Sequence, residues 1–424
     1  MPVKVEGRKI YINTQTNQTV KICDFRNQRS FYEKYYRIFP PYVKNQSELA
    51  MTVSKFGTLS ELENWLKNDR NAKREPQNEA GEQESRNSSS SGNQIEFAEE
   101  STNKRGLSEE LMSSLKEGTL KPILERVILD SVMDLQIREN YINIYYRGGN
   151  ILKITEKNRE FIPHFDINYV TENTINFTGL PYTLETNKDV EAWLNSIPYL
   201  KHEMDIWFGG HPKNEREFQQ LVSRENNYSK IANSTDYFII DIEYDNRKGD
   251  SSKKGARFDL VAVKWESDGV KRKLPKSYKP TLSFIEMKYS DGALKGKAGI
   301  GGHIKDFKTF SDVDMNITQI KSEMAEVFQQ KRELGLVTGL KGNNNRLEKF
   351  AEKIEYVFLL ANHDPEKSTL KSLLEEVLQK ENQNEYGFDI KFCTSNFMGC
   401  GLYKENFFNT KTFYENFKKQ IFNQ

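Results

Sequence analysis

Two apolar runs of the sequence carry ionisable side chains at positions where a buried strand would have apolar ones. Asp259 lies in the first run, RFDLVAV at 257–263, and Glu286 and Lys288 lie in the second, SFIEMKY at 283–289. An unpaired carboxylate or ammonium is costly to bury, so these groups need partners, a metal ion or a cleft. Two carboxylates and a lysine at one place are the groups that metal-assisted cleavage of a phosphodiester requires.

The spacing within the second run decides which side chains can act together. Successive side chains of a β-strand point to opposite faces, so Glu286 and Lys288 share one face and Met287 lies on the other. Hard carboxylate oxygens suit Mg²⁺, and the lysine adds a compact positive charge beside them. The alternative is a surface salt bridge on an edge strand, because a lone Glu-x-Lys pattern often occurs by chance.

Hydrophobic periodicity and turn signals predict the elements around these residues. After a helix at 214–226, we expect strands at 237–244, 257–265 and 282–289. Further along, we expect a helix at 314–334, a strand at 355–361, a helix at 369–380 and a strand at 388–393. This order places Asp259 and the Glu-x-Lys pair on successive strands.

The order of these elements, with Asp in one strand and Glu-x-Lys in the next, resembles the PD-(D/E)xK nuclease superfamily over roughly residues 213–393. The resemblance implies an α+β fold with a restriction-endonuclease-like αβββαβ core. It also implies that Asp259, Glu286 and the Met287 carbonyl bind Mg²⁺, with Mn²⁺ as a substitute. Lys288 would then orient or help to activate the attacking water. The family's proline before its first Asp is replaced here by Phe258.

The helix expected before the three strands offers a further acid. Glu215 borders the apolar face that Phe218 and Val222 form. Holliday-junction resolvases of the superfamily carry a metal-site glutamate at a similar Glu-Arg-x-apolar position, which favours Glu215 over Glu217 as a catalytic residue. The alternative is a solvated glutamate at a helix start, where the helix dipole favours negative charge.

Three more polar residues are candidates for the same site. Asp241 and Glu243 share a strand face and could line the cleft next to Asp259, either as a metal ligand or as a residue that supports one. Charges on an edge strand are the alternative. Gln319 could contact the site from the helix at 314–334, as a glutamine does in some relatives of the superfamily, or be a solvated helix residue.

Positive charge gathers in the segment that contains these candidates. Residues 247–308 hold 16 Lys and Arg against 7 Asp and Glu, which suits a polyanion held by its phosphates. A basic extension at 266–280 could clamp a nucleic-acid backbone or be a plain surface loop. A glycine-rich stretch at 291–305 could hold a phosphate or be an ordinary mobile loop. The candidate nucleic-acid-binding residues are Lys271, Arg272, Lys273, Lys295 and Lys297.

The chain divides into four expected segments. Residues 1–70 are expected to form a small N-terminal α/β region that opens with a hairpin-like alternation. Residues 71–104 are expected to be a disordered linker, because positions 67–94 contain no large apolar side chain to offset the entropy of ordering. Residues 105–210 are expected to form an α/β accessory domain, and residues 211–424 the nuclease domain.

Within the accessory segment, a β-hairpin is expected around Gly148 and Gly149, because the flanking residues alternate at period two. Helices interrupted near Gly118 and Pro122 are expected before it. Strand-like pieces near 165–170 and 174–177, and a helix from about Asn187, are expected after it.

The composition excludes several classes of protein. No run approaches the about 18 apolar residues that a membrane-spanning helix needs, and the first residues lack the apolar stretch of a secretory signal. The cysteines show no metal-binding spacing and fit a reducing cytoplasm; they are Cys23, Cys393 and Cys400. Four scattered histidines show no ligand spacing and are interpreted as structural: His164, His202, His211 and His363.

The expected function is therefore that of a cytoplasmic, Mg²⁺-dependent endo- or exodeoxyribonuclease, with DNA favoured over RNA. The alternative is a catalytically inactive nucleic-acid-binding module on a nuclease-like scaffold. An RNase stays open, because metal-site geometry does not read a 2′-hydroxyl. A role in antiviral defence, restriction or repair, and a protein partner or homo-oligomer, stay open as well.

Overall fold

The computed structural model describes three short strands near the N-terminus and most of the chain from residue 105 onward. The described residues are 3–6, 9–13, 19–24, 105–170, 179–245, 257–273, 278–340, 347, 349–361, 369–383, 386–395 and 401–422. The chain forms two compact units, residues 1–99 and 100–424. The predicted linker at 71–104 lies outside the described residues, as do residues 25–70.

The first unit contains an antiparallel sheet of three strands in sequence order: β1 (Val3–Glu6), β2 (Lys9–Asn13) and β3 (Thr19–Asp24). The alternation predicted at the start of the chain is confirmed by β2 and β3. The rest of the structure belongs to the second unit.

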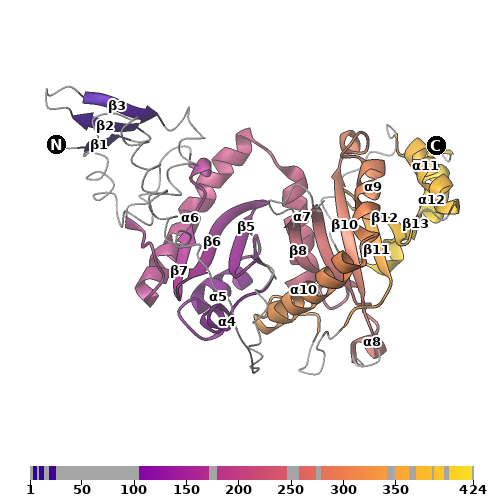
Figure 1. The fold of residues 1–424 in the computed structure, drawn as a ribbon, viewed down its shortest axis with the longest axis horizontal. Helices are drawn as coiled ribbons and strands as arrows, with labels where there is room; N and C mark the ends of the chain where they lie inside the picture. Colours follow the sequence, from indigo (N-terminus) through magenta and orange to yellow (C-terminus); the bar gives the residue numbers. More distant parts are fainter. Residues whose placement is uncertain are drawn as a thin grey trace, which may run out of the picture. The chain divides into compact units, whose positions relative to one another are not determined.

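The second unit begins with a four-stranded antiparallel sheet and three helices (Figure 1). Its strands are β4 (Met133–Ile137), β5 (Tyr141–Tyr146), β6 (Gly149–Lys157) and β7 (Glu160–His164). The helices are α4 (Glu109–Lys116), α5 (Lys121–Leu129) and α6 (Asn187–Gly210). The predicted hairpin and the interrupted helices are confirmed.

The prediction of a strand near 165–170 is wrong. This stretch forms the 3-10 helix η1 (Ile167–Tyr169), because the Asp166 side chain accepts a hydrogen bond from the Asn168 N–H and starts a turn. The strand-like piece at 174–177 lies outside the described residues.

A six-stranded mixed sheet makes up the rest of the second unit, in the order β13-β12-β11-β10-β9-β8. Its strands are β8 (Tyr237–Asp245), β9 (Arg257–Lys264), β10 (Thr281–Tyr289), β11 (Ile354–Ala361), β12 (Asp389–Ser395) and β13 (Phe408–Asn409). β8, β9 and β10 are antiparallel neighbours, whereas β10, β11 and β12 are parallel.

Six helices accompany this sheet: α7 (Asn214–Tyr228), α8 (Gly269–Lys273), α9 (Ile300–Ser311), α10 (Asp314–Glu333), α11 (Leu370–Asn382) and α12 (Thr410–Phe422). The strands and helices predicted between 214 and 393 are confirmed within a few residues of their bounds. Among the helices that the structure describes, none is both long and apolar enough to cross a lipid bilayer.

Helices cover both faces of the six-stranded sheet. On one face, Ile285 and Met287 of β10 join an apolar cluster with Phe218 of α7. On the other, Phe284 packs against Phe307 of α9, with ring centroids 5.0 Å apart. Because strand side chains alternate between faces, Glu286 and Lys288 lie on the α9 side of β10.

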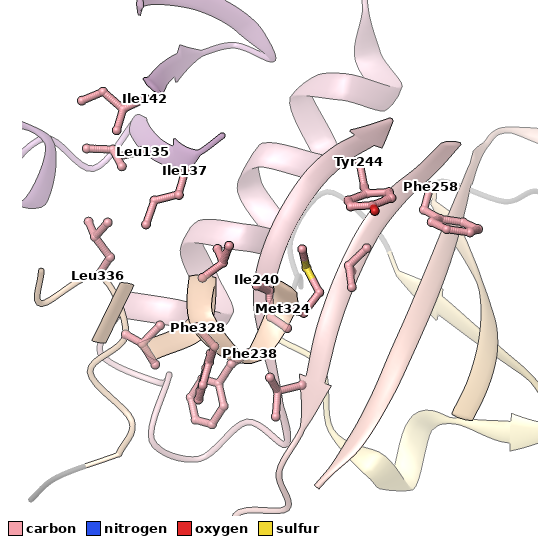
Figure 2. Packing of buried hydrophobic residues seen from close by; sticks show 14 of the residues in the cluster. Leu135, Ile137, Ile142, Phe238, Ile240, Tyr244, Phe258, Met324, Phe328 and Leu336 are labelled. Carbon is pink, nitrogen blue, oxygen red and sulfur yellow. The ribbon is translucent and has the colours of Figure 1, made fainter. Parts of the chain in front are cut away.

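The two sheets of the second unit share one hydrophobic core. Leu135 and Ile142 of the four-stranded sheet belong to the same buried cluster as Phe238 of β8 and Phe328 of α10. Figure 2 labels side chains of this cluster from both sheets and from α10, and α7 contacts strands of both sheets. The expected boundary at residue 210 therefore coincides with the turn from α6 to α7 and not with a break in the core.

The first residues of α9, from Ile300 to Lys305, were expected to belong to a glycine-rich loop at 291–305. A side chain at Gly302 would place its Cβ 2.0 Å from the Lys297 carbonyl oxygen, and one at Gly299 would place it 2.4 Å from the Leu294 carbonyl oxygen. These glycines let the chain turn tightly after β10 and begin a helix at Ile300. The loop interpretation is thus wrong from Ile300 onward.

Candidate functional site

The ladder between β9 and β10 stops before either strand ends. Its register runs from Lys264 opposite Thr281 to Leu260 opposite Ile285, although β10 continues to Tyr289. β10 remains paired with β11 along this continuation. The last residues of β10 therefore have a neighbouring strand on one side and an open ladder position on the side of β9.

Asp259 occupies this open position. Its Oδ2 accepts a hydrogen bond from the Met287 backbone N–H at 2.9 Å, and the residue is only 8% exposed. Burial raises the pKa of Asp259 well above its usual range. The negative charges of Glu286 and Glu215 raise this pKa further, while Lys288 lowers it. The main chain thus fixes a carboxyl group where negative charge is poorly balanced.

Glu286 and Lys288 form a buried ion pair beside it. Lys288 Nζ donates to Glu286 Oε1 at 2.7 Å, and both side chains are 5% exposed. Burial raises the pKa of Glu286, although Lys288 lowers it. The two carboxyl groups also act on each other, because the negative charge of Glu286 raises the pKa of Asp259. Two buried carboxylates that repel each other are stabilised by a proton or by a cation next to them.

Glu215 reaches the same place from α7, on the other side of the sheet. Its Oε2 accepts a hydrogen bond from the Tyr289 N–H at 3.4 Å, and its charge raises the pKa of both Asp259 and Glu286. Phe218 holds the start of α7 against β10, with its ring centroid 5.3 Å from that of Tyr289. The structure therefore brings Glu215, Asp259, Glu286 and Lys288 together from three elements.

His303 also belongs to this cluster, and the sequence did not single it out. It lies in the first turn of α9, with Nε2 3.1 Å from Glu286 Oε1. Burial and, to a smaller extent, the positive charge of Lys288 lower its pKa to about 4, so the ring is neutral near pH 7. One feature of the sequence could have pointed to His303: the glycine-rich segment after Glu-x-Lys allows a tight turn that brings the next helix back to β10.

The donors in this cluster fit a hard divalent cation such as Mg²⁺. A residue of a strand directs its N–H and C=O toward the same neighbouring strand, so the Met287 carbonyl faces the β9 side together with the N–H that binds Asp259. Among the described residues, no group of three or more His, Cys, Asp or Glu side chains is placed so that it could hold a metal ion as a cage of side chains. Mg²⁺ uses one or two carboxylates, keeps several waters and does not require such a cage.

Asp241 is not part of this cluster, in contrast to the tentative sequence interpretation. It is fully buried and forms ion pairs with Arg138 and with Arg105, the latter at 2.7 Å. Arg138 also donates to the Ile242 carbonyl at 2.7 Å. Asp241 therefore links β8 to the segment that precedes and forms the four-stranded sheet.

Glu243 is likewise engaged in other contacts. Its carboxylate binds Arg216 of α7 at 2.9 Å and Arg257 of β9 at 2.8 Å. Its φ of 53° lies in the left-handed region, which interrupts the alternation of β8 at this point. Gln319 is exposed on α10 and donates to Glu323 at 2.9 Å, so its contacts indicate a helix-surface residue.

The basic residues predicted to contact nucleic acid fall at two ends of the sheet. Lys271 and Arg272 lie on α8, which is anchored where Trp265 Nε1 donates to the Lys271 carbonyl at 3.1 Å. Lys264, just before Trp265, is separated from Asp259 by roughly 17 Å of extended strand. Figure 1 shows α8 below the lower end of the sheet.

Arg272 is not available as a phosphate ligand, which corrects the sequence interpretation. Its guanidinium nitrogens donate to four main-chain carbonyls, those of Asn233, Thr235, Trp265 and Gly339. Lys271 binds Glu266 at 2.6 Å. The Lys273 side chain lies outside the described residues.

Lys295 and Lys297 are placed differently. Both are exposed in the turn that follows β10 directly and precedes α9. They therefore lie at the same end of the sheet as Glu286 and Lys288.

Comparisons with protein-family models, with curated proteins and with solved structures find no match to this chain.

Proposed function

We propose that residues 211–424 carry a Mg²⁺-dependent nuclease that hydrolyses phosphodiester bonds, with DNA as the favoured substrate. The observation that carries the proposal is the position of Asp259 at the end of β10, where its Oδ2 accepts from the Met287 N–H at 2.9 Å, between Glu286 and Lys288, which pair at 2.7 Å. A buried site with two adjacent carboxyl groups and a lysine is poised to take up a divalent cation and a phosphate.

The order of elements supports the same proposal. Apart from the inserted helices α8 and α9, the series α7, the antiparallel strands β8, β9 and β10, helix α10 and the parallel strand β11 follows the αβββαβ order of a restriction-endonuclease-like core. Asp259 lies on the second strand of this series, and Glu286 and Lys288 lie on the third. On this proposal, residues 105–210 are an accessory part that packs on the nuclease core.

Each residue would contribute a distinct part of the reaction. Asp259, Glu286 and the Met287 carbonyl would hold the metal ion, which when bound lowers the pKa of a water and neutralises phosphate charge. Lys288 would orient the attacking water and offset negative charge on the phosphate. Glu215 adds a carboxylate from the opposite side, and neutral His303 steadies Glu286 without adding a charge.

A binding module without catalysis is the second candidate. It would keep the scaffold while losing the site, whereas here both carboxylates, the lysine and Glu215 are present and lie together. The two candidates differ in one measurable property, because only the nuclease cuts strands when Mg²⁺ is added.

The test is a cleavage panel of linear, circular, branched and single-stranded DNA, with RNA in parallel, in the presence of Mg²⁺ and then of excess chelator. Wild-type protein should cut at least one DNA substrate with Mg²⁺ only, and Asp259→Asn should cut none while keeping its circular dichroism spectrum. Equal cleavage by wild type and Asp259→Asn would expose a contaminating nuclease and remove the support for this site.

A further inference from the structure

A cluster of aromatic rings lies at the corner between α6 and α7. Trp207 stacks on His211, with ring centroids 4.6 Å apart and planes inclined by 19°. Tyr169 and Phe208 each contact the Trp207 ring in an edge-to-face arrangement, with a centroid distance of 5.1 Å in both pairs. These contacts make Trp207 a rigid support, and His211 forms the outermost ring of the stack.

The His211 ring is fixed as well as exposed. Its Nδ1 lies 3.0 Å from the Trp207 carbonyl oxygen, and because a carbonyl only accepts, Nδ1 carries the proton and donates. The residue is exposed to solvent, and Trp207 covers one face of its ring. A flat, pre-oriented aromatic face costs little entropy when another ring stacks on it.

Positive charge accompanies this face. Lys213 Nζ lies 5.1 Å from the centroid of the Trp207 ring, and the residue is exposed. Arg216, one turn further on, is partly exposed and binds Glu243. Aromatic faces interleaved with basic side chains are the combination that binds single-stranded nucleic acid, through base stacking and phosphate contacts.

The stack is also next to the candidate site. Lys213 is the N-cap residue of α7, and Glu215 in the first turn of the same helix accepts from the Tyr289 N–H at 3.4 Å. The exposed Lys295 and Lys297 follow the end of β10, beyond Tyr289. The His211 ring thus precedes Glu215 by four residues, and the exposed lysines follow the strand that carries Glu286.

We propose that His211, supported by Trp207 and flanked by Lys213, stacks on an unpaired base of the nucleic acid whose backbone is cut at Asp259 and Glu286. This inference rests on the proposed nuclease function and names its substrate class, which is DNA with a single-stranded stretch at the cleavage point. Within a duplex both faces of each internal base are covered by its neighbours, so along the strand an unpaired base offers His211 a face that an internal paired base does not.

Two substitutions at one position separate the ring from its hydrogen bond. His211→Asn keeps a donor near the position of Nδ1 and removes the ring, whereas His211→Phe keeps a ring and removes the donor. His202→Asn is the matched control, because His202 is also exposed on α6 but lies roughly two and a half helical turns earlier.

Binding is measured by fluorescence anisotropy in the Asp259→Asn background, so that no strand is cut. The probes are a single-stranded DNA of about 16 nucleotides, which spans one binding site, the blunt duplex of the same sequence, and a fork with an unpaired arm. His211→Asn should weaken binding of the single strand and the fork by roughly 5- to 150-fold, the range of one lost base stack. Binding of the duplex should not change, and His211→Phe and His202→Asn should bind all three probes as the background protein does.

The inference is overturned if His211→Asn binds the single strand as tightly as the background protein, or if binding of the duplex falls by the same factor. Cleavage by the chain with Asp259 intact separates this outcome from failure of the proposed function. If that protein cuts DNA with Mg²⁺ but His211→Asn changes neither binding nor rate, the stacking role alone is wrong. If it cuts nothing while His211→Asn still weakens single-strand binding, the nuclease proposal alone is wrong.

Discussion

The Met287 backbone N–H donates to Asp259 Oδ2 at 2.9 Å, just beyond the last paired residues of β9 and β10. A carboxylate thus takes the place of a strand carbonyl as the partner of a main-chain donor. An amide oxygen at residue 259 can accept the same bond without carrying a charge. The charge of Asp259 can therefore be removed with little change in geometry.

Asp259→Asn should make the protein more stable while it abolishes cleavage. In the wild type, burial and the charges of Glu286 and Glu215 raise the pKa of Asp259, so the ionised form is destabilising in the folded protein. Each kcal/mol recovered raises the Tm of a domain of roughly 150–250 residues by about 2–4 °C. Differential scanning calorimetry without divalent ions should show a higher Tm for Asp259→Asn near neutral pH.

The stability difference between Asp259→Asn and the wild type should depend on pH in one direction. Below the ordinary Asp pKa of about 3.9, folded and unfolded wild type both hold the proton and the two proteins should be similar in stability. Above it, the unfolded chain loses the proton first, so the wild type loses stability relative to Asp259→Asn until the pH passes the raised pKa. A difference that shrank as the pH rose toward neutrality would contradict this account of Asp259.

Lys288→Met should destabilise the protein by about 3–5 kcal/mol, the cost of leaving a buried charge without its partner. The charge concerned is that of Glu286, whose Oε1 accepts from Lys288 Nζ at 2.7 Å. The double variant Glu286→Gln with Lys288→Met should recover most of the loss, because no buried charge is left alone. Urea denaturation measures the free energy of unfolding of each.

The control for Lys288 is an exposed ion pair of the same type. Lys308 binds Asp312 at 2.9 Å, and these side chains are 40% and 56% exposed. Lys308→Met should change the free energy of unfolding by less than about 1 kcal/mol. If Lys288→Met were equally mild, its pairing with Glu286 would not be the buried interaction described above.

Asp241→Asn should unfold the protein or strongly lower its free energy of unfolding. The molecules that stay folded should bind metal as the wild type does. The substitution leaves Arg105 and Arg138 buried without their counter-charge, at an expected cost of about 3–5 kcal/mol. Urea denaturation measures the loss, and Mn²⁺ titration of the folded protein measures affinity. Unchanged stability with lost Mn²⁺ affinity would instead make Asp241 a site residue.

Lys295→Ala and Lys297→Ala should each reduce the salt dependence of DNA binding. Removing one phosphate contact lowers the slope of log K against log salt by about 1. Lys271→Ala should leave the slope unchanged, because Lys271 lies on α8, binds Glu266 and is at the opposite end of β9 from Asp259. DNA titrations at several salt concentrations measure the slope for all three variants. A larger change of slope in Lys271→Ala than in Lys297→Ala would mean that the DNA binds at the α8 end of the sheet and would contradict the proposed site.

Local sequence patterns were sufficient to predict most of the fold. β9 and β10 are continuous apolar runs, and α10 repeats apolar residues at helical spacing, so each is readable without its neighbours. Helix α9 was missed because glycines at its start are ordinarily a loop signal. Their role becomes visible only through the backbone that they approach, namely the Leu294 and Lys297 carbonyls.

Partners that are distant in sequence explain the site residues that could not be predicted. Asp241 is separated from Arg105 and Arg138 by more than a hundred residues of chain. The residues near Asp241 in the sequence therefore do not predict that it pairs with two arginines. The sequence around Arg272 is that of a basic surface segment and does not predict that its guanidinium donates to four main-chain carbonyls. Glu286 and Lys288 were predictable because a period of two fixes their shared face.

Calorimetric titration with Mn²⁺ tests the central claim most directly. Wild-type protein should bind Mn²⁺ at a site that is lost in both Asp259→Asn and Glu286→Gln, with each variant still folded by circular dichroism. Mn²⁺ binding that is identical in wild type and both variants, or absent from wild type, would contradict the assignment of Asp259 and Glu286 to a shared divalent ion.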